Sequence, residues 1–177
     1  MTDNDWSLRD RAIEYETGWY TGGYDLVEQP DGTAKRYYWA DLPPAVVIIP
    51  IIDDDIIVVS QYRPAVRERH IELPAGIVES GESYTQAAQR ELKEETNFAA
   101  AGLSLIQELS VATGVLRHQR AYVFAEGLEP VQVANDSNEF LTVSHLPIDE
   151  AIETARAPPA NDSTITGLLL AREEGLL

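Results

Sequence analysis

The chain has 177 residues, 44% of them hydrophobic, which is enough apolar material for one well-buried core but not comfortably for two. Its 30 acidic residues outnumber 13 basic ones and give a formal net charge of −17, which would repel nucleic acid and anionic membranes. Cysteine is absent and the three histidines are scattered, so disulfides and thiolate metal sites are excluded, and any metal site must be built from oxygen.

No run of uncharged apolar residues approaches the roughly 18 that a membrane span needs. The first residues are acidic, where a signal peptide would be basic and then apolar. We therefore expect a soluble, cytoplasmic protein with no membrane partner.

The basic residues include only two lysines, Lys35 and Lys93, so carboxylates crowd the surface. This composition resembles that of proteins from extreme halophiles, because molar salt shortens the Debye length to about 3 Å and screens repulsion among carboxylates. A merely acidic bacterial protein is the alternative.

The first half of the chain is rich in β-prone runs. Residues 25–40, DLVEQPDGTAKRYYWA, predict a hairpin because two such runs flank an Asp-Gly turn signal. Residues 45–64, AVVIIPIIDDDIIVVSQYRP, predict two strands around three consecutive aspartates. We expect one domain over 1–177, with an N-terminal β extension at 1–42 and the core at 43–177.

The second half mixes helices and strands. Residues 84–96 predict a helix, because the segment has no Gly or Pro, is rich in helix formers and follows Ser83, a favourable N-cap residue. Three alternating segments predict strands, at 103–111, 120–128 and 139–146. Two closing helices are expected, at 148–155 and 161–174.

Three glutamates share one face of the helix predicted at 84–96. At about 100° per residue, Glu91, Glu94 and Glu95 fall within one arc. Like charges at these spacings destabilise an isolated helix by roughly a few tenths of a kcal/mol per pair, so a cation is expected beside them. Mg²⁺ fits, as does Mn²⁺, because both take oxygen ligands and share their shell with substrate phosphates. A solvated acidic face is the alternative.

The spacing around these glutamates resembles the Nudix box. The pattern runs through Gly76, five residues, Glu82, seven residues, Arg90-Glu91-Leu92, one residue, and Glu94-Glu95. The resemblance implies an α/β fold, in which an α/β/α sandwich surrounds a mixed β-sheet. It also implies that the three glutamates bind metal ions and that Glu82 pairs with Arg90. Asn97 stands where the pattern has Gly, and we expect it to adopt the left-handed backbone that Asn tolerates.

Segments on both sides of the box look like those of ADP-ribose pyrophosphatases, notably QYRPAVRERHIELPAG and NEFLTVSHLPIDEAIETA. By this likeness Arg63 contacts a substrate phosphate, Glu72 hydrogen-bonds the substrate, and the carbonyl of Ala75 joins the metal ligands. Arg63 could instead be a surface ion-pair partner. Glu139 matches an acidic loop residue that binds metal or helps to activate water, although an ordinary loop acid before a strand is equally compatible with its position.

A basic cluster interrupts this acidic chain at Arg117, His118 and Arg120. These side chains could grip substrate phosphates or a terminal group, and Arg117 is our candidate substrate contact. A structural ion-pair patch is the alternative. Two departures from many ADP-ribose pyrophosphatases broaden the choice of substrate: Thr113-Gly114 replaces a proline-containing pair, and Ser137 stands where a second loop glutamate is common.

These residues predict metal-assisted hydrolysis of a nucleoside diphosphate compound, with ADP-ribose giving AMP and ribose 5-phosphate. Two or three divalent ions would polarise the diphosphate while water attacks one phosphorus. The predicted catalytic residues are Glu91, Glu95 and Glu139. A sugar nucleotide, a dinucleotide or an oxidised nucleoside triphosphate is the alternative substrate. A non-catalytic nucleotide sensor is a further alternative, although such a protein would tolerate loss of the box carboxylates and the box is complete here.

Six aromatic residues lie in a short N-terminal segment, roughly 19–39, that cannot bury them by itself. Aromatic residues are enriched at interfaces, and the resembling ADP-ribose pyrophosphatases commonly pair through such a segment. We therefore expect a homodimer whose partner helps to complete the nucleotide site. Packing against the chain's own sheet is the alternative. The six residues are Trp19, Tyr20, Tyr24, Tyr37, Tyr38 and Trp39.

Overall fold

The structure is a computed structural model that describes residues 6–132 and 140–177. The chain divides into two compact units. The smaller unit contains Met1–Pro44 and Leu109–Gln119, and the larger unit contains Ala45–Glu108 and Arg120–Leu177. The segment 109–119, which the sequence does not separate from the core, thus groups with the N-terminal strands. Within the described part of the chain, no helix is long and apolar enough to cross a membrane.

The larger unit is built on a mixed sheet in the order β11-β5-β4-β10-β8, with β6 beside β5 and β7 beside β4. β10 runs parallel to β4, whereas β5, β7 and β11 form antiparallel pairs. The strands are β4 (Ala45–Ile52), β5 (Asp55–Arg63), β6 (Glu68–Glu72), β7 (Ala75–Ile77), β8 (Phe98–Ser110), β10 (Gln119–Pro130) and β11 (Leu141–Pro147).

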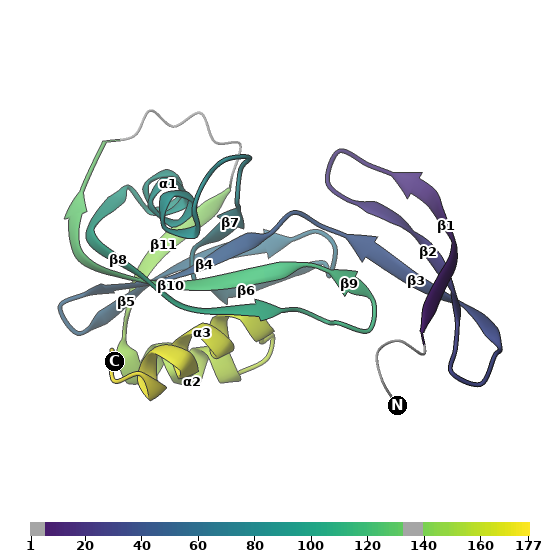
Figure 1. Cartoon of the computed structure of the whole chain (residues 1–177). Coiled ribbons are helices and arrows are strands. Elements are labelled where there is room, and N and C mark those ends of the chain that lie inside the picture. Colours follow the sequence, from purple (N-terminus) through teal and green to yellow (C-terminus); the bar gives the residue numbers. More distant parts are fainter. Residues whose placement is uncertain (1–5, 133–139) are drawn as a thin grey trace. The chain divides into compact units, whose positions relative to one another are not determined.

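Helices cover both faces of this sheet. α1 (Tyr84–Thr96) lies on one face, and α2 (Ile148–Arg156) and α3 (Asp162–Glu173) lie on the other (Figure 1). This α/β/α sandwich confirms the fold predicted from the sequence. The helix expected at 84–96 has the predicted bounds, and strands and helices occur in the second half where the patterns indicate them.

Strand β4 is apolar at nearly every position because both of its faces are covered, as expected for a central strand. Val46 and Ile48 belong to the cluster that packs beneath α1. On the opposite face, Ile49 lies beside Gly167 of α3, where a β-carbon would crowd Leu73 and Tyr122 as well. The unbroken run of β-branched residues in the sequence therefore reflects burial on two sides.

The smaller unit contains a four-stranded sheet in the order β1-β2-β3-β9. β2 (Thr21–Glu28) and β3 (Ala34–Asp41) form the hairpin that the sequence predicts. β1 (Ser7–Glu16) was not predicted, because it is highly charged and mostly exposed and therefore lacks the alternating pattern. Cross-strand ion pairs join it to β2, including the pair of Arg11 with Asp25 at 2.9 Å. The last strand is β9 (Leu116–Arg117).

Candidate active site

Helix α1 has a well-defined start and end. The hydroxyl of Ser83 accepts a hydrogen bond from the backbone N–H of Gln86, whose side-chain oxygen accepts one in return from the N–H of Ser83. This capping box satisfies backbone donors that a helix start otherwise leaves unpaired. At the other end Asn97 has φ 59° and ψ 30°, so the expected left-handed cap is confirmed. The caps fix where the helix begins and ends, and the packing of Ala88 and Leu92 in the core sets which face its glutamates occupy.

Two glutamates of α1 converge on the short strand β7. The backbone N–H of Ala75 donates a hydrogen bond to Oε2 of Glu95 at 3.1 Å. A β-carbon at Gly76 would overlap the carboxylate of Glu91, so this carboxylate lies directly against the glycine. Glu91 and Glu95 are also buried, with 9% and 7% of their surfaces exposed. The i,i+4 spacing thus places two adjacent carboxylates against one three-residue strand.

The turn that leads into β7 is held by two further backbone contacts. The N–H of Leu73 donates to the hydroxyl of Thr164 on α3 at 3.1 Å, and the N–H of Ile48 donates to the carbonyl oxygen of Pro74 at 2.8 Å. Thr164 is buried and lies 91 residues away from Leu73 in the chain. Nothing in the local spacing of the sequence indicates this contact, because only the folded sheet brings α3 beneath the turn.

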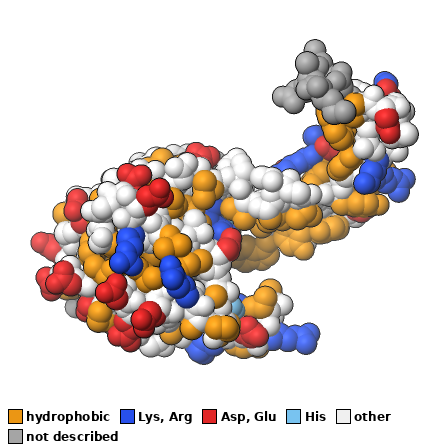
Figure 2. Space-filling view, turned by 90° about the horizontal axis from the view of Figure 1, so that it is seen from below, with side chains coloured by type: hydrophobic (Ala, Val, Ile, Leu, Met, Phe, Trp, Pro, Cys, Tyr) orange, Lys and Arg blue, Asp and Glu red, His pale blue; other side chains and the backbone are white. Residues whose placement is uncertain are grey.

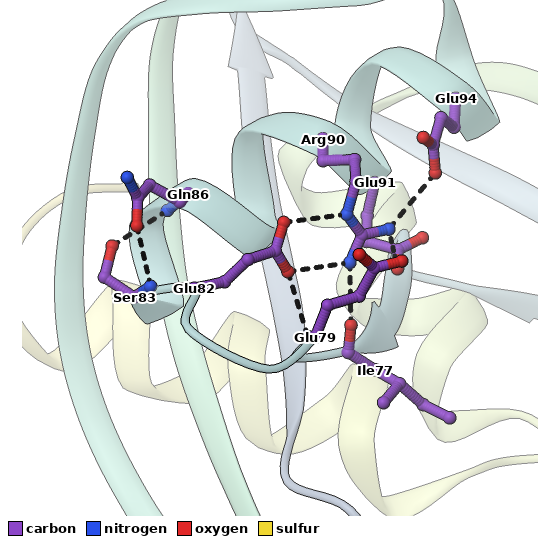
Figure 3. A network of polar contacts seen from close by, with 8 residues as sticks. All are labelled: Ile77, Glu79, Glu82, Ser83, Gln86, Arg90, Glu91 and Glu94. Atoms are coloured by element: carbon purple, nitrogen blue, oxygen red, sulfur yellow. Dashed lines mark hydrogen bonds and ion pairs between the residues drawn. The ribbon is translucent and has the colours of Figure 1, made fainter.

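Arg90 connects the loop before α1 to the glutamates on the helix (Figure 3). Its guanidinium donates to both carboxylate oxygens of Glu82, at 2.9 and 3.0 Å, and to the carbonyl oxygen of Ile77 at 2.8 Å. Its Nη1 atom lies 2.6 Å from Oε1 of Glu91 and 3.2 Å from Oε2 of Glu94. The expected pairing of Glu82 with Arg90 is therefore present in the structure.

The hydrogen bonds within this network favour the ionised forms of Arg90 and Glu82. The hydrogen bonds that Arg90 donates to Glu82 raise the pKa of Arg90 above its already high ordinary value, outweighing the opposing effect of burial. In return, hydrogen bonding by Arg90 lowers the pKa of Glu82. Both groups are therefore ionised at neutral pH, and Arg90 carries the positive charge closest to the box glutamates among the contacts described. Glu94 is the most open of these glutamates, with 44% of its side chain exposed.

Arg63 and Glu72 form an ion pair on neighbouring strands. Nε of Arg63 donates to the two carboxylate oxygens of Glu72 at 3.2 and 3.0 Å, and Nη2 contacts the same carboxylate. Glu72 is 6% exposed, whereas the side chain of Arg63 is 44% exposed. The structure thus brings together Arg63 and Glu72, the two predicted substrate contacts. Glu72 lies three residues before the start of β7. The ion pair that was the alternative for Arg63 also exists.

The basic cluster at 117–120 is divided between the two units. In the smaller unit Arg117 pairs with Asp25 at 2.7 Å and stacks on Trp39, with the guanidinium carbon 3.9 Å from the ring centroid. In the larger unit Arg120 pairs with Asp162 at 2.8 Å. Both arginines therefore form ion pairs within the protein, which is what the structural alternative predicts. Substrate binding by Arg117 stays a prediction.

The residues present fit a divalent cation. All the candidate ligands are oxygen atoms. Because Gly76 has no β-carbon, the Glu91 carboxylate lies directly against its backbone. Across residues 6–132 and 140–177, no three acidic, histidine or cysteine side chains are gathered closely enough to form a metal-binding group. Glu91 and Glu94 instead both contact Arg90. The candidate ligand Glu139 and the variant position Ser137 lie outside the described residues.

The fold and the glutamate-bearing helix define a hydrolase of the Nudix type, and comparisons with known proteins agree. The NUDIX domain family matches residues 41–167. ADP compounds hydrolase NudE of Escherichia coli is 32% identical over 130 residues, covering 73% of this chain and 70% of that protein. An ADP-ribose pyrophosphatase of Bacillus subtilis is 29% identical over 164 residues, or 89% of each protein.

A solved structure supports the same conclusion over nearly the whole chain. The crystal structure of an ADP compounds hydrolase superimposes with a TM-score of 0.87 and 26% sequence identity, covering 97% of this chain and 95% of that one. The chain therefore belongs to the NUDIX family, and it is a pyrophosphohydrolase.

Proposed function

We propose that the protein hydrolyses the diphosphate linkage of an ADP compound, with ADP-ribose as the leading substrate. Water adds to one phosphorus, the bridging P–O bond breaks, and ADP-ribose yields AMP and ribose 5-phosphate. The names of two relatives, an ADP compounds hydrolase and an ADP-ribose pyrophosphatase, support this choice. The observation that carries the proposal is the convergence of Glu91 and Glu95 on Ala75 and Gly76.

Mg²⁺, or Mn²⁺ in its place, is the proposed cofactor. Glu91, Glu94, Glu95 and the carbonyl oxygen of Ala75 would hold it, together with Glu139. When bound, such an ion supplies positive charge against the diphosphate and lowers the pKa of water. The protein's contribution is to hold the carboxylates in place before the substrate arrives, through the caps of α1, the Arg90 network and the backbone contacts of β7.

Arg63 and Glu72 are proposed to orient the substrate. The fork of the Arg63 guanidinium matches phosphate oxygens, and its exposed side chain is accessible to them. The Glu72 carboxylate can only accept hydrogen bonds while it is ionised, so it suits a substrate hydroxyl or amine. In the structure Arg63 donates hydrogen bonds to Glu72, which keeps the buried Glu72 carboxylate paired.

A substrate panel tests this function. The protein is incubated with Mg²⁺ and, in parallel, ADP-ribose, sugar nucleotides, NADH, diadenosine polyphosphates and nucleoside triphosphates, and the products are separated. ADP-ribose should give the highest kcat/KM, with AMP and ribose 5-phosphate as products. A higher kcat/KM for another compound would replace ADP-ribose as the substrate. Binding without hydrolysis of any compound would support the sensor alternative, which the complete set of box glutamates disfavours.

The smaller unit is proposed to form a homodimer interface. Trp19 and Tyr38 are 73% and 53% exposed in the single chain, and Figure 2 shows hydrophobic side chains gathered along this sheet. Other aromatics pack within the unit, as Tyr24 does against Tyr38, so the alternative of self-packing holds for part of the segment. Light scattering in high salt tests the proposal, since an active particle of 19.6 kDa at nanomolar concentration would rule out an obligate dimer.

A further inference from the structure

His70, on β6, is a buried polar residue whose hydrogen bonding is incomplete. It is 7% exposed, and neither ring nitrogen has a hydrogen-bond partner in the part of the chain that the structure describes. Nε2 lies 3.8 Å from a carboxylate oxygen of Glu68, which is too distant for a hydrogen bond. Leaving a buried donor or acceptor without a partner lowers the stability of the folded state. Such a residue calls for an explanation.

The register of β5 and β6 places His70 among the proposed substrate contacts. Side chains alternate along a strand, so Glu68, His70 and Glu72 share one face of β6. On β5, Gln61 is paired with His70 and Arg63 is paired with Glu68.

The Arg63 side chain does not stay at its own register position. It reaches along the strands to Glu72, and the ion pair therefore spans the position of His70. Residues that point the other way, such as Ile71, line a separate cavity of about 300 Å³ that faces Thr154 of α2. His70 thus lies on the face that carries the proposed substrate contacts, between two of their side chains.

We propose that His70 is a substrate-contact residue that hydrogen-bonds a sugar hydroxyl of the nucleotide. This proposal rests on the proposed function and extends it. A neutral imidazole offers one donor and one acceptor, and a hydroxyl group can be the partner of either. A phosphate offers only acceptors, so it could pair with the ring donor but not with the ring acceptor. When substrate engages Arg63 and Glu72, one ring nitrogen of His70 gains a hydrogen-bond partner.

A double-mutant cycle between protein and ligand tests the contact. Affinities are measured by titration calorimetry for AMP and 2′-deoxy-AMP, and for ribose 5-phosphate and 2-deoxyribose 5-phosphate, with the original protein and with His70→Phe. Removing the contacted hydroxyl should weaken binding to the original protein about threefold to tenfold, the worth of one hydrogen bond. It should change binding to His70→Phe by less than twofold. The product pair that shows this coupling identifies which sugar His70 contacts.

Thermal unfolding separates this role from a structural one. Because His70 makes no hydrogen bonds among the described residues, His70→Phe should unfold at the same temperature as the original protein or slightly higher. Ile71→Val, on the opposite face of the same strand, is the matched control and should retain the original affinities. His70→Gln and His70→Asn keep a donor and an acceptor near Nε2 and Nδ1 respectively, so partial recovery of the coupling in one of them names the nitrogen.

If removing the hydroxyl weakens binding to the original protein and to His70→Phe by the same factor for both product pairs, the proposal is overturned. The same holds if His70→Phe lowers the unfolding temperature and leaves every affinity unchanged, because His70 would then be a structural partner of Glu68. Neither result depends on hydrolysis. A protein that binds AMP with the expected coupling but does not cleave ADP-ribose would sink the proposed function and leave the His70 contact standing.

Discussion

At the scale of single residues, the carboxylates that the sequence singles out differ in their surroundings. Glu91 and Glu95 are buried against β7, whereas Glu94 is more open and contacts Arg90. We predict that Glu91→Gln and Glu95→Gln each lower kcat by at least about a hundredfold, because each removes a charge that stabilises the transition state. Near-normal turnover of either variant at saturating Mg²⁺ would remove that residue from the site.

Circular dichroism and thermal unfolding provide the control for these two variants. Glutamine is nearly isosteric with glutamate and keeps a carbonyl oxygen, so the hydrogen bond from the N–H of Ala75 to residue 95 can persist. The fold should therefore survive in both proteins. A variant that unfolds would say nothing about catalysis and would instead identify the carboxylate as structural.

Gly76 gives a second prediction at this scale. Its φ is not positive, so alanine is compatible with the backbone, but the added β-carbon would overlap the Glu91 carboxylate. Since that carboxylate is the far end of a flexible side chain, we expect Gly76→Ala to displace it while the protein remains folded. Turnover should fall by at least about tenfold. Because both changes act through one group, Gly76→Ala should have little further effect in the Glu91→Gln background. Additive losses would contradict this.

At the scale of elements, the pairing of Glu82 with Arg90 braces the loop before α1. The pKa of Glu82 is lowered by hydrogen bonds from Arg90, so ionised Glu82 stabilises the folded state above its ordinary pKa of 4.5. This stabilisation is lost as pH falls below 4.5 and through the lower pKa of the folded state. We therefore predict that Glu82→Gln lowers the free energy of unfolding at pH 7 and has a much smaller effect well below pH 4.5.

Urea unfolding at several pH values measures this effect. The matched control is the same substitution in an Arg90→Gln background, where the ion pair no longer exists. There Glu82→Gln should lower the free energy of unfolding less at pH 7, and the loss should depend less on pH. If the single variant is destabilised equally at both extremes of pH, Glu82 acts through its shape or its contact with Glu79 rather than through its charge.

The sequence predicts some elements well because their signals are local. The capped helix at 84–96 has a periodic pattern, an N-cap and a C-cap residue, and the run at 45–52 is apolar because β4 is buried on both faces. β6 and β7 were not predicted, because they have only five and three residues, and β7 pairs with β4, which lies far before it in the chain. The contact of Thr164 with Leu73 and the incomplete hydrogen bonding of His70 were missed for the same reason. Both are properties of the assembled sheet.

At the scale of the whole molecule, charge is the dominant feature. Arginines take part in many of the ion pairs within the described part of the chain, such as those of Arg11 and Arg117 with Asp25, but the formal net charge remains −17. Most of the carboxylates therefore cannot be neutralised internally. Their mutual repulsion weakens the folded state relative to the expanded chain, in which the charges lie farther apart. This imbalance supports the proposed adaptation to high salt.

We predict that the thermal unfolding midpoint rises steadily between 0.1 M and 2 M KCl. At about 0.1 M the Debye length is about 10 Å, so exposed pairs at longer separations are already screened, whereas repulsion between neighbouring carboxylates is not. Further salt shortens this length to about 3 Å near 1 M and should continue to stabilise the protein. Raising osmolarity equally with a neutral osmolyte provides the control for solvent exclusion. Midpoints that agree at 0.1 M and 2 M would show that the acidic surface is not a salt adaptation, while leaving the hydrolase assignment intact.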